Sequence, residues 1–264
     1  MSFGPYRLVR PLGRSAVGTR WVALDERTGE SRTVYRFPAT GDHAERRRML
    51  DALERIGSLD NPHLVTVDQY SLDHAEGVWA IAAYRGHQSG LVGIRELANA
   101  KGGQLSVTES LRAIDQLLSG ISAAHDAGIA HGPVSPEEVF VDRHGSVWVE
   151  LYGFARAVRG PATADEMVVR DEIRSIVSLG YTLLTGLDAE EPRMAPSRVV
   201  RKLDKWWDGW FDRGLEAAGG FESADEARHA LLGDGTSIDD SPTVTTRPAR
   251  GVLSRFRKPT ASGR

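Results

Sequence analysis

Short runs of β-branched and aromatic residues, separated by polar stretches, occupy the first third of the chain, and such runs are typical of strands. The five runs are 6–9, 21–24, 33–37, 64–70 and 78–84. A polar, glycine-bearing stretch at 25–30 has the composition of a hairpin connection. After a capping pair at Asp42 and Glu45, apolar residues recur at helical spacing from Met49 to Ile56. The pattern predicts a strand-rich unit with one helix inserted after its third strand.

The middle of the chain changes to the period of amphipathic helices. Ser106 and Glu109 have the spacing of a capping box, in which each side chain accepts a hydrogen bond from the other residue's backbone N–H. The segment behind them carries a periodic apolar face and ends near Gly128. A second such helix is predicted at about 171–185, and a short one at 223–232. This second unit is therefore predicted to be mainly helical.

Three tryptophans lie close together in the helical unit. At helical spacing, Trp207 with Trp210 or Phe211 faces the core and Trp206 faces outward. Core packing is the simpler interpretation, and an aromatic surface for a partner is the alternative.

Composition and charge exclude several classes of function. The 264 residues, 41% of them hydrophobic, suffice for one large domain or two packed lobes. The formal charge of −3 gives no electrostatic case for binding nucleic acid. The chain has no cysteine, which excludes disulfides and thiol nucleophiles and suits the cytoplasm. The most apolar segment, 176–187, is shorter than the roughly 20 residues that span a bilayer, so no membrane span is expected.

The composition changes again near the end of the chain. Residues 234–264 are rich in Gly, Ser, Thr, Pro and charge, and we predict a disordered tail because so little apolar surface is available to offset the entropy of ordering. Within it, acidic residues at 239–240 precede several threonines at 243–246, a pattern similar to segments read by phosphothreonine-binding domains. The basic stretch 250–258 is expected to be a solvated linker. The alternatives are a contact for anionic lipid and a segment that precedes a membrane span in a longer parent protein.

Two short motifs point to a family. The first is His131-Gly132-Pro133-Val134-Ser135-Pro136-Glu137-Glu138, and the second is Leu151-Tyr152-Gly153. Their spacing resembles the H-R-D-x-x-x-x-N and D-F-G motifs of protein kinases. Leu183-Leu184-Thr185-Gly186 is similar to the end of the family's long C-lobe helix. The chain thus resembles bacterial Ser/Thr protein kinases of the Hanks type.

The resemblance implies an α+β, two-lobed protein-kinase-like fold. It places a strand-rich N-lobe at 6–86, a mainly helical C-lobe at 87–233 and the tail at 234–264. Only 18 residues separate Gly153 from Glu172, which stands at the Asp position early in the long helix. The segment that supports a protein substrate in the family is therefore expected to be shortened.

The residues that carry the chemistry of the family are absent. Pro133 stands at the general base, Glu138 at the metal-binding Asn and Leu151 at the metal-binding Asp, and Ser135 is a further changed position of the loop. Glu150, next to Leu151, is expected to point to the opposite side of an extended strand and into solvent. No catalytic residue and no metal site are expected, and the resemblance implies a pseudokinase.

The nucleotide pocket is expected to survive only as a remnant. Its aligned positions are Gly13, Gly18, Val34, Arg36, Ala82 and Phe140. In the glycine-rich loop, Ser15 replaces the second glycine and Arg20 the following valine; the strand lysine falls at Arg36 and its helix glutamate partner at Ala52. Val34, Arg20 and Phe140 predict a narrowed adenine slot, whereas Ala82 at the gatekeeper leaves space behind it.

Two hypotheses of function follow. The first is a catalytically inactive scaffold or regulatory module with weak or no ATP binding, whose protein partner is a kinase or a phosphothreonine-binding domain that reads the tail. The alternative is a divergent phosphoryl or nucleotidyl transferase that uses Arg36, Glu138 and Glu150, and only this alternative requires ATP and magnesium as cofactors.

Overall fold

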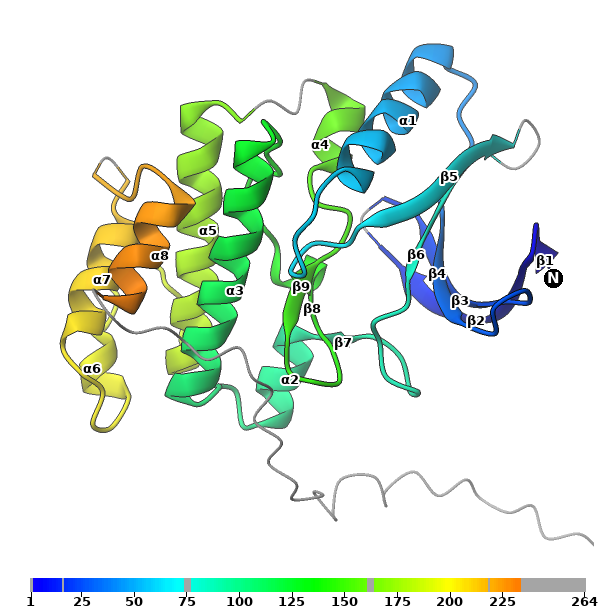
Figure 1. Ribbon diagram of the computed structural model, residues 1–264. Coiled ribbons are helices and arrows are strands. Elements are labelled where there is room, and N and C mark those ends of the chain that lie inside the picture. Colours follow the sequence, from blue (N-terminus) through cyan, green and yellow to red (C-terminus); the bar gives the residue numbers. More distant parts are fainter. Residues whose placement is uncertain (1, 16, 74–76, 161–163, 218, 234–264) are drawn as a thin grey trace, which may run out of the picture.

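The structure is a computed structural model that describes residues 2–15, 17–73, 77–160, 164–217 and 219–233. It consists of a strand-rich lobe with one long helix, followed by a mainly helical lobe (Figure 1). This arrangement confirms the predicted α+β, two-lobed fold. The residue bounds assigned to the two lobes stay a prediction, and the predicted tail, 234–264, lies outside the described residues.

Six antiparallel strands build the sheet of the N-lobe, in the order β1-β2-β3-β4-β6-β5. They are β1 (Ser2–Phe3), β2 (Tyr6–Arg14), β3 (Thr19–Asp25), β4 (Ser31–Arg36), β5 (Val67–Asp73) and β6 (Gly77–Ala83). Side chains alternate between the two faces of a sheet. One face carries Tyr6, Ala23, Val34 and Ile81, which pack together away from the helix. The other face packs against the inserted helix and looks toward the C-lobe.

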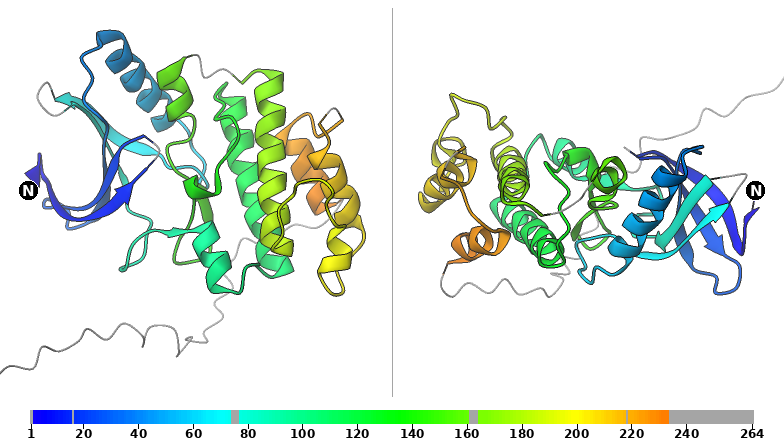
Figure 2. Two further views of the ribbon diagram at one scale, coloured as in Figure 1. Left: turned by 180° about the vertical axis from the view of Figure 1, so that it is seen from behind. Right: turned by 90° about the horizontal axis from the view of Figure 1, so that it is seen from above.

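The inserted helix, α1 (His43–Gly57), begins where the capping pattern predicts. The side chain of Asp42 accepts a hydrogen bond from the Ala44 N–H at 2.8 Å. The helix buries one apolar face, which includes Ala52, Leu53 and Ile56, against the sheet. Viewed from behind, α1 lies beside a short helix of the C-lobe, α4 (Phe154–Arg159) (Figure 2).

The C-lobe holds most of the helices and a small three-stranded sheet. The other helices are α2 (Ile94–Ala100), α3 (Val107–Asp126), the 3₁₀ helix η1 (Pro136–Glu138), α5 (Glu166–Thr185), α6 (Pro196–Val199), α7 (Trp206–Leu215) and α8 (Ala224–Leu232). The strands are β7 (Val92–Gly93), β8 (Val139–Val141) and β9 (Val147–Val149). This small sheet lies where the two lobes meet (Figure 1). No helix in the described ranges is long and apolar enough to cross a membrane.

Two helices, α3 and α5, form the centre of the C-lobe. The predicted capping box opens α3, with Ser106 and Glu109 each accepting from the backbone of the other. The two helices approach closely at Gly180, where a Cβ atom would lie 2.6 Å from the side chain of Ile114. The start of α5 differs from the prediction, because the helix begins five residues before Asp171, at Glu166, with Asp165 as its cap.

The aromatic cluster of α7 belongs to the core. Trp207, Trp210 and Phe211 are almost completely buried, and their rings pack against one another. Trp206 is 41% exposed and stacks on Trp207. The predicted orientation of the three tryptophans is confirmed.

Candidate functional site

The loop that resembles the catalytic loop is fixed from below by one buried carboxylate. Glu172 of α5 has no solvent exposure, and its Oε2 atom accepts hydrogen bonds from the backbone N–H groups of His131 at 3.0 Å and Gly132 at 3.2 Å. The hydroxyl of Tyr152 donates to the other oxygen of the same carboxylate. The Nε2 atom of His125 lies 3.4 Å from Glu172. These contacts hold the two motifs together.

Ser135 and Glu138, which differ from the kinase motif, contact other groups of the same loop. The backbone N–H of Ser135 donates to Glu138 Oε2 at 3.1 Å, which opens η1 as a capping box. Glu138 Oε1 lies 3.5 Å from His131 Nε2. Pro133 has no ionisable group and lines a hollow of about 560 Å³ beside Arg156. In this arrangement Ser135 and Glu138 stabilise the backbone.

Charge couples His131 to Glu138. Burial alone would lower the pKa of His131, but the hydrogen bond and the charge of Glu138 raise it above its ordinary value. Burial would raise the pKa of Glu138, and His131 instead holds it below its ordinary value. The folded protein therefore favours the imidazolium–carboxylate pair.

This pair predicts a pH-dependent contribution to stability. A raised histidine pKa stabilises the fold below the ordinary value of 6.5, and this contribution is lost as pH rises through the folded pKa. A lowered Glu138 pKa stabilises above 4.5 and is lost as pH falls through the folded pKa. We expect the stability difference between the wild type and Glu138→Gln, measured by urea unfolding, to be largest between these values and to shrink toward pH 8. Glu96→Gln, an exposed change on α2, is the control and should show no such window.

The second motif does not continue the preceding strand. The strand β9 ends at Val149, and Leu151 has a left-handed backbone with φ of +43°. Leu151 is 3% exposed and packs in the apolar core under α1, with Ala52 and Phe154. Because the chain turns here, the alternation expected for Glu150 does not apply. The prediction of a solvated Glu150 on the opposite side is wrong, since Glu150 is 6% exposed between the lobes.

An ion pair crosses the cleft between the two lobes. Arg20, on β3 of the N-lobe, donates from Nη1 to Glu150 Oε2 of the C-lobe at 2.7 Å. Both side chains are at least nine-tenths buried. The Arg20 guanidinium carbon also lies 5.1 Å from the centre of the Phe140 ring, within the range of a cation–π contact. Phe140 in turn stacks on Trp148, with ring centres 4.9 Å apart.

Burial and the neighbouring polar groups act in opposite directions on the pKa of Glu150. Burial raises the pKa of Glu150, and the charge of Arg20 together with the nearby Tyr35 hydroxyl partly offsets that effect. Burial also raises the pKa of Tyr35 well above its ordinary value, and the negative charge of Glu150 adds to the shift. We call Arg20 and Glu150 the cleft pair, and the hydroxyl of Tyr35 lies beside it.

The faces of β4 differ from those implied by the sequence alignment. Val34 packs with Tyr6, Ala23 and Ile81 on the outer face of the sheet. By strand alternation, Arg36 shares that face, whereas Tyr35 points toward the cleft, in the same core as Phe140. The expectation that Val34 and Arg36 line the nucleotide slot is wrong by one residue.

Tyr35 therefore takes the place that the alignment gave to Arg36. It lies in the same apolar core as Ala52, the position of the family's helix glutamate. Where the resemblance places the ion pair of an active kinase, this chain has an aromatic ring and a methyl group.

The glycine-rich loop closes on itself. The backbone N–H of Ser15 donates to the Gly18 carbonyl at 2.8 Å, and the Val17 N–H donates to the Ser15 hydroxyl at 3.3 Å. A Cβ at Gly18 would lie 2.3 Å from the carbonyl oxygen of Arg36, so close packing against β4 requires glycine there. Gly13 has φ of +87° at an irregular point of β2. Close packing explains the glycine at Gly18 and backbone conformation explains the glycine at Gly13, and neither explanation requires a bound phosphate.

Two spaces of very different size lie beside this loop. A hollow of about 700 Å³ lies on the outer side of Arg20 and Phe140, and Pro11, Leu12 and Arg14 also line it. The space on the inner side is far smaller. Ser15, Val17, Glu138, Glu150 and Leu151 surround a void of about 10 Å³, with His131 and Ala155 completing its wall. Such a void holds at most one water molecule. Ala82, at the gatekeeper position, is fully buried in the apolar core that includes Phe140 and Leu151. Within the described residues, no group of three or more His, Asp or Glu side chains could hold a metal ion.

The chain is similar in sequence to bacterial serine/threonine-protein kinases. No protein-family model matches the chain. It is 31% identical over 159 residues to a probable serine/threonine-protein kinase, pknA2, of Bifidobacterium longum, an alignment of 58% of this chain and 20% of that protein. It is 26% identical over 205 residues to the serine/threonine-protein kinase PknD of Mycobacterium tuberculosis, covering 70% of this chain and 30% of that protein. These matches span less than a third of each relative.

A solved structure supports the same fold. The kinase domain of Mycobacterium tuberculosis PknI superposes with a TM-score of 0.66 at 19% sequence identity, covering 88% of this chain and 96% of that domain. At that level of identity the likeness establishes the fold alone.

Proposed function

We propose that this chain, which has the protein-kinase fold and whose sequence relatives are bacterial serine/threonine kinases, is a catalytically inactive module that binds protein partners and does not use ATP. One observation carries the proposal: the cleft pair Arg20–Glu150 lies over Phe140, where the fold would hold a nucleotide. A side chain that spans the cleft and joins both lobes competes directly with an adenine ring for the same space.

The missing chemical groups support the same conclusion. General-base assistance contributes roughly 10² to 10⁴ in rate, and Pro133 has no group that accepts a proton. Metal ions contribute several kcal/mol of charge stabilisation, and Leu151 is buried in an apolar core with no oxygen to offer. With both contributions absent, we expect no phosphoryl transfer, and the binding of other proteins is the function that we propose instead.

The alternative transferase requires three residues that the structure engages in other contacts. Glu150 is paired with Arg20, and Glu138 with His131. Arg36 lies on the face of β4 opposite the cleft. A transferase would have to break the buried ion pair before its carboxylate could reach a metal or a substrate, so no observation favours this second function.

A protein partner is the proposed ligand. Kinases and phosphothreonine-binding domains remain the candidate partners, the latter through the threonines at 243–246, which lie outside the described residues. Trp206, stacked on Trp207 and 41% exposed, offers a further aromatic contact.

Thermal unfolding with ATP tests the proposal. Any ligand that binds the native state must raise its melting temperature. We expect 5 mM ATP with magnesium or manganese to shift the melting temperature by less than about 1 °C, since a ligand present at or below its Kd stabilises by only about 0.4 kcal/mol. A metal-dependent rise of several degrees would contradict the proposal and favour the transferase.

The variant Arg20→Val serves as a matched comparison, because valine is the family residue at that position. Each protein is measured against its own nucleotide-free midpoint. If the wild type shows no shift while the variant gains one with ATP, the arginine is the obstacle. If neither responds, the remaining substitutions also contribute.

A further inference from the structure

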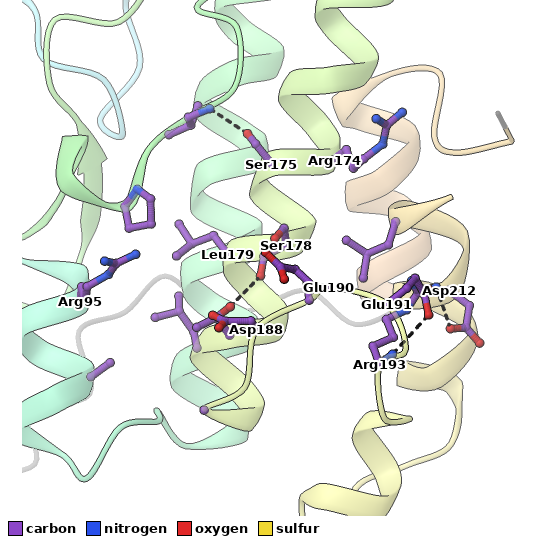
Figure 3. Close-up of a pocket in the computed structure, with 18 of the residues that line it drawn as sticks. Arg95, Arg174, Ser175, Ser178, Leu179, Asp188, Glu190, Glu191, Arg193 and Asp212 are labelled. Atoms are coloured by element: carbon purple, nitrogen blue, oxygen red, sulfur yellow. Dashed lines mark hydrogen bonds and ion pairs between the residues drawn. The ribbon is translucent and has the colours of Figure 1, made fainter. Parts of the chain in front are cut away.

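A large groove opens on the C-lobe, away from the cleft. It has a volume of about 1300 Å³ and lies between α2, α5, the end of α7 and the connection after Gly186 (Figure 3). Its apolar lining includes Val134, Leu179, Leu183 and Leu215.

The groove follows one stripe of α5. Ser175, Ser178, Leu179, Thr182 and Leu183 line it at the three- and four-residue spacing of a single helix face. The connection between the second motif and α5 is described at 154–160 and 164–165, and neither part contributes to the lining. The helix in that connection, α4, packs against α1 instead. The stripe is therefore left uncovered by the described part of this connection.

The arginines of the groove are neutralised by neighbouring carboxylates. Their partners are Glu137 for Arg95 at 3.1 Å, Asp171 for Arg174 at 3.2 Å, Glu191 and Asp212 for Arg193, and Glu226 for Arg213. Three further carboxylates of the lining, Asp188, Glu190 and Glu216, are exposed and form no ion pair with any residue that the structure describes. The groove thus presents the apolar side chains Val134, Leu179, Leu183 and Leu215, which we call its apolar floor, beside the hydroxyl side chains of α5. It also carries three carboxylates that have no ion-pair partner among the described residues.

One segment of this chain has the complementary chemistry. Residues 247–264 carry six basic residues and no acidic residue, and they include the apolar side chains Val252, Leu253 and Phe256. The acidic residues that follow Gly233 all precede this segment, at 234, 239 and 240.

We propose that the groove binds the chain's own segment 250–258, with Leu253 and Phe256 on the apolar floor and its basic residues facing Asp188, Glu190 and Glu216. The occupant is an intramolecular ligand, held at the high effective concentration that a short tether provides. This inference concerns a different surface from the nucleotide cleft and holds whether or not the cleft binds ATP.

The tether is long enough for this contact. The pairing of Arg213 with Glu226 places the start of α8 against the groove wall at the end of α7. Gly233 lies seven residues further along, which is about 10 Å of helix. Residues 234–249 can span up to about 50 Å when extended. The segment therefore reaches the groove without strain.

Paramagnetic labelling of the full chain tests the contact. The chain contains no cysteine, so Ser254→Cys introduces a single attachment point for a nitroxide. We expect the amide NMR signals of Ser178, Thr182 and Ala189 to lose most of their intensity, and the loss to disappear in a variant that also carries Asp188→Lys, Glu190→Lys and Glu216→Lys. The matched control, Asp51→Lys, Glu54→Lys and Asp60→Lys, makes the same change of charge on exposed N-lobe residues and should keep the broadening.

Three results would overturn the inference. The first is no loss of signal at the groove in the labelled chain. The second is a loss that survives charge reversal at the groove as fully as at the control sites. The third is broadening of the same signals in an isotope-labelled chain mixed with a nitroxide-labelled, unenriched chain, because the occupant would then come from a second copy.

Discussion

Replacing Arg20 with methionine is expected to lower the free energy of unfolding by about 3–5 kcal/mol, the usual effect of leaving one charge of a buried pair without its partner. Methionine keeps much of the length of the side chain and removes the charge. Glu150 would then remain buried without the guanidinium that offsets its desolvation. Urea unfolding at neutral pH measures the change.

Two further variants separate the ion pair from general effects of mutation. The double variant Arg20→Met, Glu150→Gln should recover most of the loss, since no unpaired charge remains. Arg7→Met breaks an exposed Arg–Glu pair, with Glu26, at 3.2 Å, and is expected to cost less than about 1 kcal/mol. If Arg20→Met and Arg7→Met cost the same, the cleft pair does not join the lobes in the way we infer.

Helix starts were predictable where a cap and an apolar face coincide. Asp42 and Ser106 each begin a helix at the residue that the sequence indicated. The start of α5 was missed because its first turns lie at the surface, where Met167 is 72% exposed and the apolar period carries no signal. The buried face begins at Ile173, near the predicted start.

The face of β4 was not predictable from composition. Val34 and Tyr35 are both apolar enough to be buried, and both are at most 2% exposed because the two faces of the sheet are each covered. An alignment error of one residue then exchanges the two faces completely. Only the three-dimensional packing shows that Tyr35, and not Arg36, faces the cleft.

The cleft pair was hidden for a related reason. From its place in the loop motif, Arg20 was expected to narrow the nucleotide slot. Its partner, Glu150, was expected to face solvent because a continuous strand was assumed. A turn with positive φ at Leu151 reverses that orientation. A left-handed backbone is uncommon at leucine. The residue type at this position therefore did not indicate a turn.

Replacing Glu172 with alanine is expected to destabilise the fold by about 3–5 kcal/mol, because the two backbone N–H groups of His131 and Gly132 and the Tyr152 hydroxyl lose their acceptor in a buried place, at about 1–3 kcal/mol for each unsatisfied group. Urea unfolding measures the loss, and amide hydrogen exchange of Gly132 should speed up more than that of residues in α3.

Glu166→Ala on the same helix is the control for Glu172→Ala. Its side chain is 78% exposed and pairs with Arg170 at the surface, so a change below about 1 kcal/mol is expected. Glu172→Gln keeps an acceptor oxygen and should fall between the two. Equal stability of the Glu172 and Glu166 alanine variants would show that the loop at 131–138 keeps its shape without this carboxylate, and the loop geometry would then need a cause other than α5.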